Sequence, residues 1–374
     1  MATVLTGDTR SRARVAGNLS GRAAAGGHWW ALGQWALGLR DLGVRTTLTD
    51  NGPEATAAPT AAEDLGLAGA LHHVSHTPKY SPPIGPARLE TDLALRVMGD
   101  LGDAAPTSPG RSIFLDIDPG YPQMWRELGL ADMFEGHDRF VTIGENIGRP
   151  DCAIPDCGLE WVTTPPPVVL DAWPPTPGGE SFTTVATWRN PYGTVDWNGI
   201  TYGSRVHEFR KFLELPRLVD ADFELALDID AAEVDDLALL DRNGWRLVDP
   251  RLVAGTPDSY RSYIQASKAE ICIAQNMYVA TRSGWISDRS LCYLASGKPV
   301  LAQDTGFSDN YPVGEGLIAF STLDEAASGV EEIERNYERH SRAAREFADE
   351  FFDSRKVLTR LLDRLEISRP VQAR

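Results

Sequence analysis

Hydrophobic and polar residues along the chain follow two periodicities, which together predict an α/β protein. Residues 13–16 are apolar enough for a short strand, and a glycine-rich stretch comes after them. Between His28 and Leu42 the apolar residues recur at intervals of three and four, which is typical of a helix with one buried face. Gly43 ends this helix, and residues 44–48 are predicted to form a second strand. A strand, a glycine turn, a helix and a strand in this order open a doubly wound domain.

The same alternation continues and then starts again in the second half of the chain. Two apolar segments, residues 111–118 and 139–144, are predicted strands of the first half. Further strands are expected at residues 182–187, 223–227, 245–248, 271–274 and 299–302, helices at 204–213, 257–267 and 287–296, and a mostly helical, charged region at 323–365. The pattern therefore predicts two Rossmann-like units.

A proline-rich segment marks the boundary between these units. Residues 163–179 combine many prolines with two glycines and interrupt both periodicities. A length of 374 residues suits two domains, since single cores rarely grow beyond ~250–300 residues. A second proline-rich segment, residues 78–86, is predicted to form a surface loop. We predict an N-terminal domain over residues 1–165, a linker over 166–180, a C-terminal domain over 181–345, and a final helix over 346–374 that can cross back to the first domain.

The net charge limits the classes of partner. It is -17 at pH 7, and such a surface repels a phosphate backbone or an anionic membrane, so we expect no nucleic-acid partner. No apolar run approaches the ~20 residues that span a bilayer, and the first ten residues lack the apolar core of a secretory signal. We therefore expect a cytoplasmic protein without a membrane span. Only five of the 36 basic residues are Lys, which indicates a GC-rich bacterial source; the oligomeric state stays open.

Two patterns are compatible with a metal, and neither is specific. Cys152 and Cys157 are separated by four residues, a gap that departs from the usual zinc spacing, so reduced thiols are favoured. Asp116 and Asp118 form an Asp-x-Asp motif, which can chelate a divalent cation through a diphosphate. The same spacing recurs in Leu227-Asp-Ile-Asp, which shows how common the motif is. We expect neither metal nor cofactor, and we expect both aspartates to line a crevice between the domains.

The segment 281–306 says most about chemistry. Ser283 and Gly284 predict a flexible turn, and Ser287 is a good N-cap for the short helix that follows. The free N–H groups and the positive dipole end at such a helix start bind anions. Two arginines at the same end can pair with phosphate groups, namely Arg282 and Arg289.

The string Ser-Asp-Arg…Leu-Ala-Ser-Gly-Lys-Pro-Val-Leu-Ala-x-Asp-Thr-Gly over residues 287–306 resembles the donor-site core of GT-B glycosyltransferases. The similarity is to the spore-maturation-type branch related to the large retaining family 4, and it is clearest over residues 249–365. It implies the GT-B fold, in which two Rossmann-like domains face each other across a crevice, and a nucleoside-diphosphate sugar as the donor. It implies donor phosphate contacts at Ser283, Gly284, Asp288 and Arg289, and ribose or sugar contacts near Cys292, Gln303, Asp304 and Thr305.

The sequence departs from that family at one pair of positions. Retaining family 4 members typically carry two glutamates spaced eight apart, and Gly284 and Cys292 occupy these positions here. The resemblance therefore predicts the fold and leaves the ribose contact and the retaining outcome open.

Further candidate positions follow from the layout of the two units. Gly26 and Gly27 match the glycine loop through which phosphate approaches the first domain, although a plain strand-to-helix turn fits equally well. Arg189 lies where GT-B enzymes place a diphosphate-binding Arg, with a solvated loop Arg as the alternative. Lys298 is expected at the surface. The backbone at Val248 and Asp249 is expected to meet the nucleobase, and Trp29, Trp30 and Asp116 to contact the acceptor.

The catalytic base stays open at this level. An inverting transfer needs a carboxylate or His of the first domain to deprotonate the acceptor. The candidates are His28, Asp118 and Glu145, with His72 or His73 as further options. A retaining transfer by front-face attack, guided by the donor phosphate, needs no protein nucleophile.

The predicted function is transfer of a sugar from a nucleoside-diphosphate sugar to a small-molecule acceptor with a hydroxyl, amine or thiol group. Natural-product and cell-surface glycan biosynthesis are the candidate settings. The alternatives are a nucleotide-sugar epimerase or hydrolase on the same fold, and a non-catalytic sugar-nucleotide-binding protein.

Overall fold

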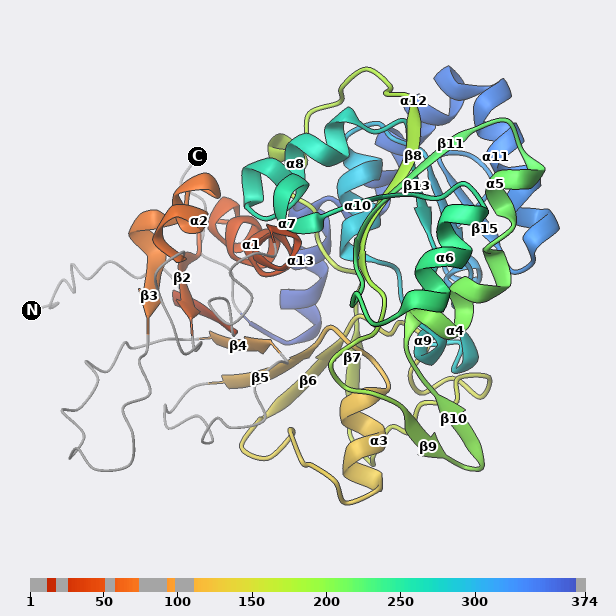
Figure 1. Ribbon diagram of the computed structural model, residues 1–374. Coiled ribbons are helices and arrows are strands. Elements are labelled where there is room, and N and C mark those ends of the chain that lie inside the picture. Colours follow the sequence, from red (N-terminus) through yellow and green to blue (C-terminus); the bar gives the residue numbers. More distant parts are fainter. Residues whose placement is uncertain (1–11, 18–25, 51–57, 74–92, 98–110, 368–374) are drawn as a thin grey trace, which may run out of the picture.

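Two parallel sheets, one in each half of the chain, form the frame of the protein (Figure 1). The computed structural model describes residues 12–17, 26–50, 58–73, 93–97 and 111–367. The first sheet has the strand order β3-β2-β1-β4-β5-β6-β7, and the second has the order β12-β11-β8-β13-β14-β15. Counted within its own half, each sheet contains the order 3-2-1-4-5-6 of the Rossmann fold. The prediction of two Rossmann-like units is confirmed.

The first half of the chain supplies seven parallel strands and three described α-helices. Its elements are β1 (Arg12–Gly17), α1 (Gly26–Asp41), β2 (Arg45–Asp50), α2 (Ala58–Asp64), the 3-10 turn Ala68–Ala70, β3 (Leu71–His73), β4 (Leu93–Val97), β5 (Arg111–Asp116), α3 (Tyr121–Glu127), β6 (Arg139–Thr142) and β7 (Trp161–Thr163). The predicted loop at residues 78–86 and the stretch between β1 and α1 lie outside the described residues.

The second half contains the six-stranded sheet, a small hairpin and most of the helices. In order these are β8 (Ser181–Thr187), β9 (Val195–Trp197), β10 (Ile200–Tyr202), α4 (Arg205–Phe209), α5 (Leu215–Leu218), β11 (Asp222–Asp228), α6 (Val234–Arg242), β12 (Arg246–Val248), α7 (Pro250–Val253), α8 (Pro257–Ala266), β13 (Ala269–Cys272), α9 (Asn276–Ala280), α10 (Asp288–Ala295), β14 (Val300–Gln303), β15 (Leu317–Phe320), α11 (Leu323–Arg335), α12 (Tyr337–Phe347) and α13 (Ser354–Arg364). Short 3-10 turns lie at Leu170–Ala172, Arg210–Phe212 and Phe307–Asp309, and a π-helical turn at Ala348–Phe352 joins α12 to α13.

Local chemistry fixes several of these boundaries. The Thr256 hydroxyl accepts a hydrogen bond from the Ser259 N–H, and Pro257 occupies the first position of α8, where its missing N–H costs nothing. Thr322 caps α11 in the same way, with Glu325 completing a capping box. The helix expected at 204–213 instead narrows to a 3-10 turn after Phe209. None of the helices in the described part of the chain is both long and apolar enough to cross a membrane.

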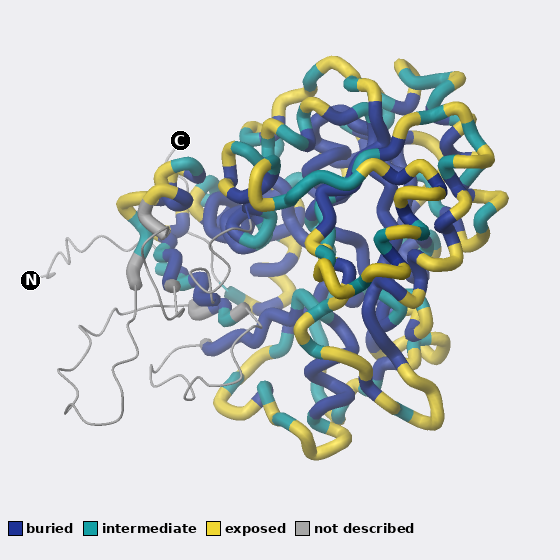
Figure 2. The backbone as a smooth tube through the Cα atoms, viewed as in Figure 1, coloured by how far each residue is buried: buried dark blue, intermediate teal, exposed yellow. Residues whose placement is uncertain are grey.

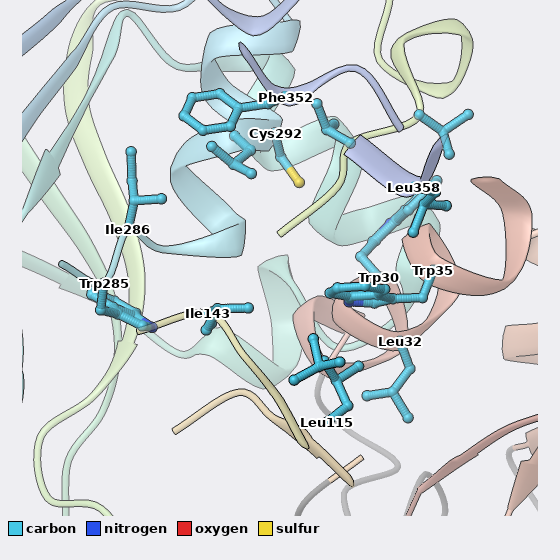
Figure 3. Packing of buried hydrophobic residues seen from close by; sticks show 14 of the residues in the cluster. Trp30, Leu32, Trp35, Leu115, Ile143, Trp285, Ile286, Cys292, Phe352 and Leu358 are labelled. Carbon is cyan, nitrogen blue, oxygen red and sulfur yellow. The ribbon is translucent and has the colours of Figure 1, made fainter. Parts of the chain in front are cut away.

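One hydrophobic core runs through both halves. Helix α1 brings Trp30 and Trp35 into this core, and α10 and α13 add Cys292 and Leu358 from the second half of the chain (Figure 3). Helix α13 packs along α1, so the end of the chain returns to the first sheet (Figure 1). Figure 2 shows the consequence, since buried backbone continues from the strands of both sheets into the helices between them. A second core cluster, confined to the second half, fills the space around Phe182 and Trp245.

The proline-rich segment between the halves is held by two cations of the second half. The Lys298 ammonium is fully buried and donates to the Thr176 and Pro177 carbonyls, which corrects the predicted surface position. The Arg345 guanidinium donates to the Trp173 carbonyl at 2.8 Å. Burial lowers the pKa of Lys298 to about 8. Residues 173–179 therefore behave as part of the second half, because their carbonyls have cationic donors there.

We predict that Lys298→Met lowers the free energy of unfolding by ~2–4 kcal/mol, because methionine keeps the apolar stem and removes the buried donor of the Thr176 and Pro177 carbonyls. Urea titration of the intact chain measures this. Lys268→Met is the control: its ion pair with Glu334 is partly exposed, so a loss of less than ~1 kcal/mol is expected. Equal losses in the two variants would contradict the anchoring role of Lys298.

Candidate functional site

The strand order reverses between β8 and β13 in the second sheet, and open α/β sheets bind ligands at such a point, beyond the carboxyl ends of the strands. Asn190 follows β8 and Gln275 follows β13, and the two side chains meet there, with the Asn190 Nδ2 2.5 Å from the Gln275 Oε1. Asp118 arrives from the other half of the chain, two residues beyond the end of β5. The carboxyl ends of three strands from both halves thus converge on one place.

A directed series of hydrogen bonds joins these side chains. The Gln275 Nε2 donates to the Tyr278 hydroxyl at 3.1 Å, and the Tyr278 hydroxyl donates to the Asp118 Oδ1 at 2.6 Å. The Tyr192 hydroxyl donates to the Asp118 Oδ2 at 3.3 Å. Asn190 also donates to the Tyr121 hydroxyl. Two tyrosine hydroxyls thus donate to the two carboxylate oxygens of Asp118. Hydrogen bonds to an ionised carboxylate favour that form.

Aromatic rings surround this carboxylate. Tyr121 lies 4.9 Å from Tyr192 between ring centroids, and Trp125 lies 5.3 Å from Tyr192. On the other side Tyr278 stacks on Trp285 at 4.4 Å. Burial and the Asp118 charge raise the pKa of Tyr278 well above its ordinary range, so its hydroxyl stays a donor. Asp118, Asn190, Tyr192 and Gln275 are half-buried, which leaves room for a ligand to reach them. We call these residues with Tyr278 the Asp118 cluster.

Helix α10 begins close to this cluster. Its N-cap residue, Ser287, makes no side-chain capping bond, so the first N–H groups of the helix lack the usual partner. Asp288 occupies the first helical position and is half-buried. Burial raises the pKa of Asp288 to about 6, with a smaller contribution from the charge of Asp118, while Arg289 and the backbone N–H groups act in the opposite direction. The effect of the Asp118 charge on Asp288 is consistent with a short distance between the Asp118 cluster and the start of α10.

Arg289 does not belong to the Asp118 cluster. Its guanidinium is buried, donates to the Glu270 carboxylate at 2.5 Å and to the Val185 carbonyl at 2.9 Å, and lies against Cys272. The predicted phosphate contact at Arg289 is therefore corrected, because all its donors point into the second sheet. The sequence places Arg289 at the helix start and does not reveal that Glu270 lies beneath it on β13.

The loop before α10 also differs from the prediction. The Ser283 N–H donates to the Tyr278 carbonyl at 3.2 Å, and the Gly284 N–H donates to the Thr305 carbonyl at 2.9 Å. These two amides are thus occupied by the protein and are not available to a diphosphate. Gly284 has a φ of +73°, which explains the glycine. Thr305 donates through its hydroxyl to the Trp285 carbonyl at 2.5 Å and so holds the loop from the other side.

The residues of α1 that were predicted to contact donor or acceptor pack against other parts of the protein instead. A Cβ on Gly26 would lie 2.1 Å from the Thr256 carbonyl oxygen, and one on Gly27 would lie 2.7 Å from the Tyr260 ring. The glycines are needed here for close packing of α1 on the α7–α8 segment. Trp29 and Trp30 are both buried, and the Trp30 indole N–H donates to the Pro257 carbonyl at 2.8 Å. The predicted acceptor role of both tryptophans is thus corrected to a core role.

Asp116 also belongs to the interior. It is fully buried and accepts hydrogen bonds from Gln123 at 2.7 Å and Thr142 at 2.8 Å, while burial raises its pKa to about 7. Its predicted place in the lining of the crevice and its acceptor contact are corrected, because protein donors occupy the carboxylate. Its Oδ1 accepts from the Asp118 N–H and so fixes the backbone that carries Asp118.

The remaining predicted residues lie outside the Asp118 cluster. Arg189 pairs with Glu233 and is about half exposed, and Asp249 pairs with Arg251 directly after Val248 at the end of β12. Arg282 pairs with Asp151 and Asp309, and Glu145 pairs with Tyr311, where burial raises the pKa of Glu145 to about 7. Three of the predicted ribose or sugar contacts are bonded within the protein. Gln303 donates to Glu208, Asp304 accepts from the Gly306 N–H, and Cys292 contacts Gln34. His28 is half-buried on α1. Of His72 and His73, only the β3 backbone is described.

Sequence reasoning missed most of the Asp118 cluster. Asn190 and Tyr192 follow β8, the first strand of the six-stranded sheet in chain order, and Gln275 and Tyr278 follow β13, its fourth. The usable signal was positional, because polar residues directly after the first and fourth strands of a doubly wound sheet flank its switch point.

Comparison with known structures gives the architecture its name. No protein-family model matches the sequence, and no curated protein matches it either. Solved structures do match over nearly the whole chain. An α-glucosyltransferase in complex with UDP and a mismatched DNA superposes with a TM-score of 0.62 at 12% identity, covering 95% of this chain and 99% of that one. The chain has the GT-B fold.

Two further GT-B structures align equally fully. Anabaena HepE, in complex with UDP and glucose, has a TM-score of 0.57 at 13% identity, with 96% of this chain and 100% of that chain covered. AviGT4, a glycosyltransferase involved in avilamycin A biosynthesis, has a TM-score of 0.54 at 12% identity, covering 95% and 97%. The GT-B expectation drawn from residues 287–306 is thus confirmed at the level of the fold.

We predict that Arg289→Ala lowers the free energy of unfolding by ~3–5 kcal/mol, because Glu270 is fully buried and would lose its only ionic partner among the described residues. Chemical denaturation measures the loss, and adding Glu270→Gln to the variant should recover part of it. Arg335→Ala, which breaks an exposed pair with Glu331, is the neutral control. Lower nucleotide affinity with unchanged stability would instead support the phosphate role.

Proposed function

We propose that this GT-B protein transfers a sugar from a nucleoside-diphosphate sugar to a nucleophilic group of a small-molecule acceptor. The observation that carries the proposal is the Asp118 cluster, in which a carboxylate of the first half meets the switch point of the second. Several of the matched structures are complexes with UDP or UDP-glucose, which supports a nucleotide donor. A DNA acceptor, as present beside the α-glucosyltransferase, is disfavoured by the net charge of -17.

The second half of the chain holds the donor in this proposal. The start of α10, where Ser287 makes no side-chain capping bond, turns a positive dipole end to the diphosphate. Arg189 is close to the end of β8 and can exchange Glu233 for a phosphate, since an exposed ion pair costs little to break. The backbone at Val248 and Asp249 meets the base. A diphosphate here adds negative charge near Asp288 and favours the protonated form of that carboxyl group.

Asp118 is the proposed base. As the acceptor oxygen or nitrogen bonds to the anomeric carbon, the bond from that carbon to the diphosphate breaks, and the acceptor proton passes to Asp118. The Tyr278 and Tyr192 hydroxyls hold the carboxylate in place before the reaction. Closed domains keep water away and so limit hydrolysis of the donor.

Calorimetry with UDP-, GDP- and dTDP-sugars on folded protein tests the donor step. We expect one of these nucleotides to bind and its sugar to be transferred only when an acceptor is present. Turnover of the donor without an acceptor would instead indicate an epimerase or hydrolase, and binding without any turnover would indicate a non-catalytic binding protein. Absence of binding to every nucleotide would refute the proposal.

We predict that Asp118→Asn lowers kcat by ~10²–10⁴-fold, the usual contribution of a general base, while donor affinity changes little. Steady-state kinetics and calorimetry separate the two quantities. Asp171→Asn is the matched control, since Asp171 is 79% exposed and pairs only with Arg355 among the described residues. An unchanged kcat in Asp118→Asn would show that the donor phosphate takes the proton, as in front-face retaining transfer.

A further inference from the structure

Asn146 of the first half is inserted into the second half at the loop that precedes α10. It follows β6 and is fully buried. Its backbone N–H donates to the Ser283 carbonyl at 3.0 Å, and its Nδ2 donates to the carbonyls of Arg282 at 3.0 Å and Gly306 at 3.1 Å. Its Oδ1 accepts from the Asn310 Nδ2 at 3.0 Å. All these partners belong to the other half of the chain.

The two loops bound by Asn146 are separate in sequence and adjacent in space. One is residues 282–284, which lead into α10, and the other is residues 304–306, which follow β14. The loops touch through the Gly284 N–H, which donates to the Thr305 carbonyl at 2.9 Å, and through the Thr305 hydroxyl, which donates to the Trp285 carbonyl. Asn146 adds the third connection, because one amide group binds a carbonyl from each loop.

The glycines of both loops are fitted to this side chain. A Cβ on Gly284 would lie 2.7 Å from the Asn146 Cγ, and one on Gly306 would lie 2.7 Å from the Asn146 Nδ2. Their φ angles are +73° and +91°, so glycine is favoured at both positions for backbone reasons as well. Two loops from one half thus leave a space that is filled by one amide from the other.

The chemistry requires an amide at this position. Two carbonyl oxygens face Nδ2 and one amide donor faces Oδ1, and only Asn or Gln presents two donors and an acceptor on one planar group. A carboxylate of the same shape would place negative charge against the Arg282 and Gly306 carbonyls and supply no donor. Without the Asn146 side chain, the carbonyls of Arg282 and Gly306 would lose their donor from the first half.

We propose that Asn146 is a positioning residue that joins the loop before α10 to the loop after β14 only when the two domains close. When the domains separate, the carbonyls of Arg282, Ser283 and Gly306 lose their donors on Asn146 and bind water instead, so the two loops are no longer held together. When the domains close, Asn146 fixes both loops and thereby the start of α10. This inference deepens the proposed function, on which it rests for the identity of the ligand, and it assigns the coupling between closure and the donor site to one side chain.

Hydrogen exchange of the full chain tests the coupling without any substrate. We expect Asn146→Asp to speed exchange of the Ser283 and Gly284 amides at least ~10-fold, the effect of losing one buried hydrogen bond or more, while strands β11 and β13 keep their protection. Arg149→Ala is the matched control, because Arg149 also reaches across to Asn310 at 2.6 Å but is exposed and binds neither loop. Unchanged exchange in Asn146→Asp, or equal acceleration in both variants, would overturn the assignment.

Nucleotide affinity separates positioning from a merely structural role. With UDP, GDP or dTDP as the probe, whichever the wild-type protein binds, the dissociation constant of Asn146→Asp should rise ~10–100-fold for the folded protein. A lower unfolding temperature with unchanged affinity would overturn positioning. If the wild-type protein binds no nucleotide, the proposed function fails, and the exchange experiment still decides the coupling. Asn146→Ala, which adds no charge, serves in both measurements if the aspartate variant does not fold.

Discussion

Buried polar groups at the interface between the two halves have their partners on the opposite half, and this constraint organises the rest of the structure. Asp118 is held by tyrosines of the second half, and Asn146 holds backbone carbonyls of the second half. These bonds matter for the domain arrangement, because a buried polar group without a partner costs ~1–3 kcal/mol. The domain arrangement is therefore specified by hydrogen bonds as well as by apolar contact, and the same bonds place the candidate base opposite the candidate donor loops.

The linker contributes to that arrangement by being fixed rather than loose. Lys298 and Arg345 take up the carbonyls of a segment that is rich in proline and so poor in its own donors. Residues before the anchored part are paired too, since Val168 forms an isolated bridge with Asp353. The two chain crossings between the halves thus lie side by side. Relative motion of the domains has to take place around this pair of crossings, with residues 173–179 moving together with the second half.

Periodicity predicted the two sheets and most long elements, because strands and helices of a doubly wound fold are specified locally by which residues face the core. It failed where a side chain's direction depends on a distant element. Arg289 has the position of a phosphate ligand in the sequence, yet Glu270 on a neighbouring strand draws it inward. Trp30 lies near a helix start expected to face a ligand, yet it is buried and its indole N–H donates to the Pro257 carbonyl of the other half. The role of Asn146 could not be predicted from the neighbouring sequence, because its side-chain partners lie in loops more than a hundred residues away.

Helix α13 lies along α1, with the Leu358 and Ser354 side chains so close to Gly38 that an added Cβ would lie 2.6 Å and 2.8 Å from them. The first sheet and its principal helix leave the ribosome early, but the helix that covers this side of α1 is synthesised some 300 residues later. During synthesis the nascent first domain therefore exposes an apolar face of α1 for as long as the second domain takes to appear. The N-terminal core is complete only after α13 has been synthesised, so the first domain cannot finish folding before the second domain has been made.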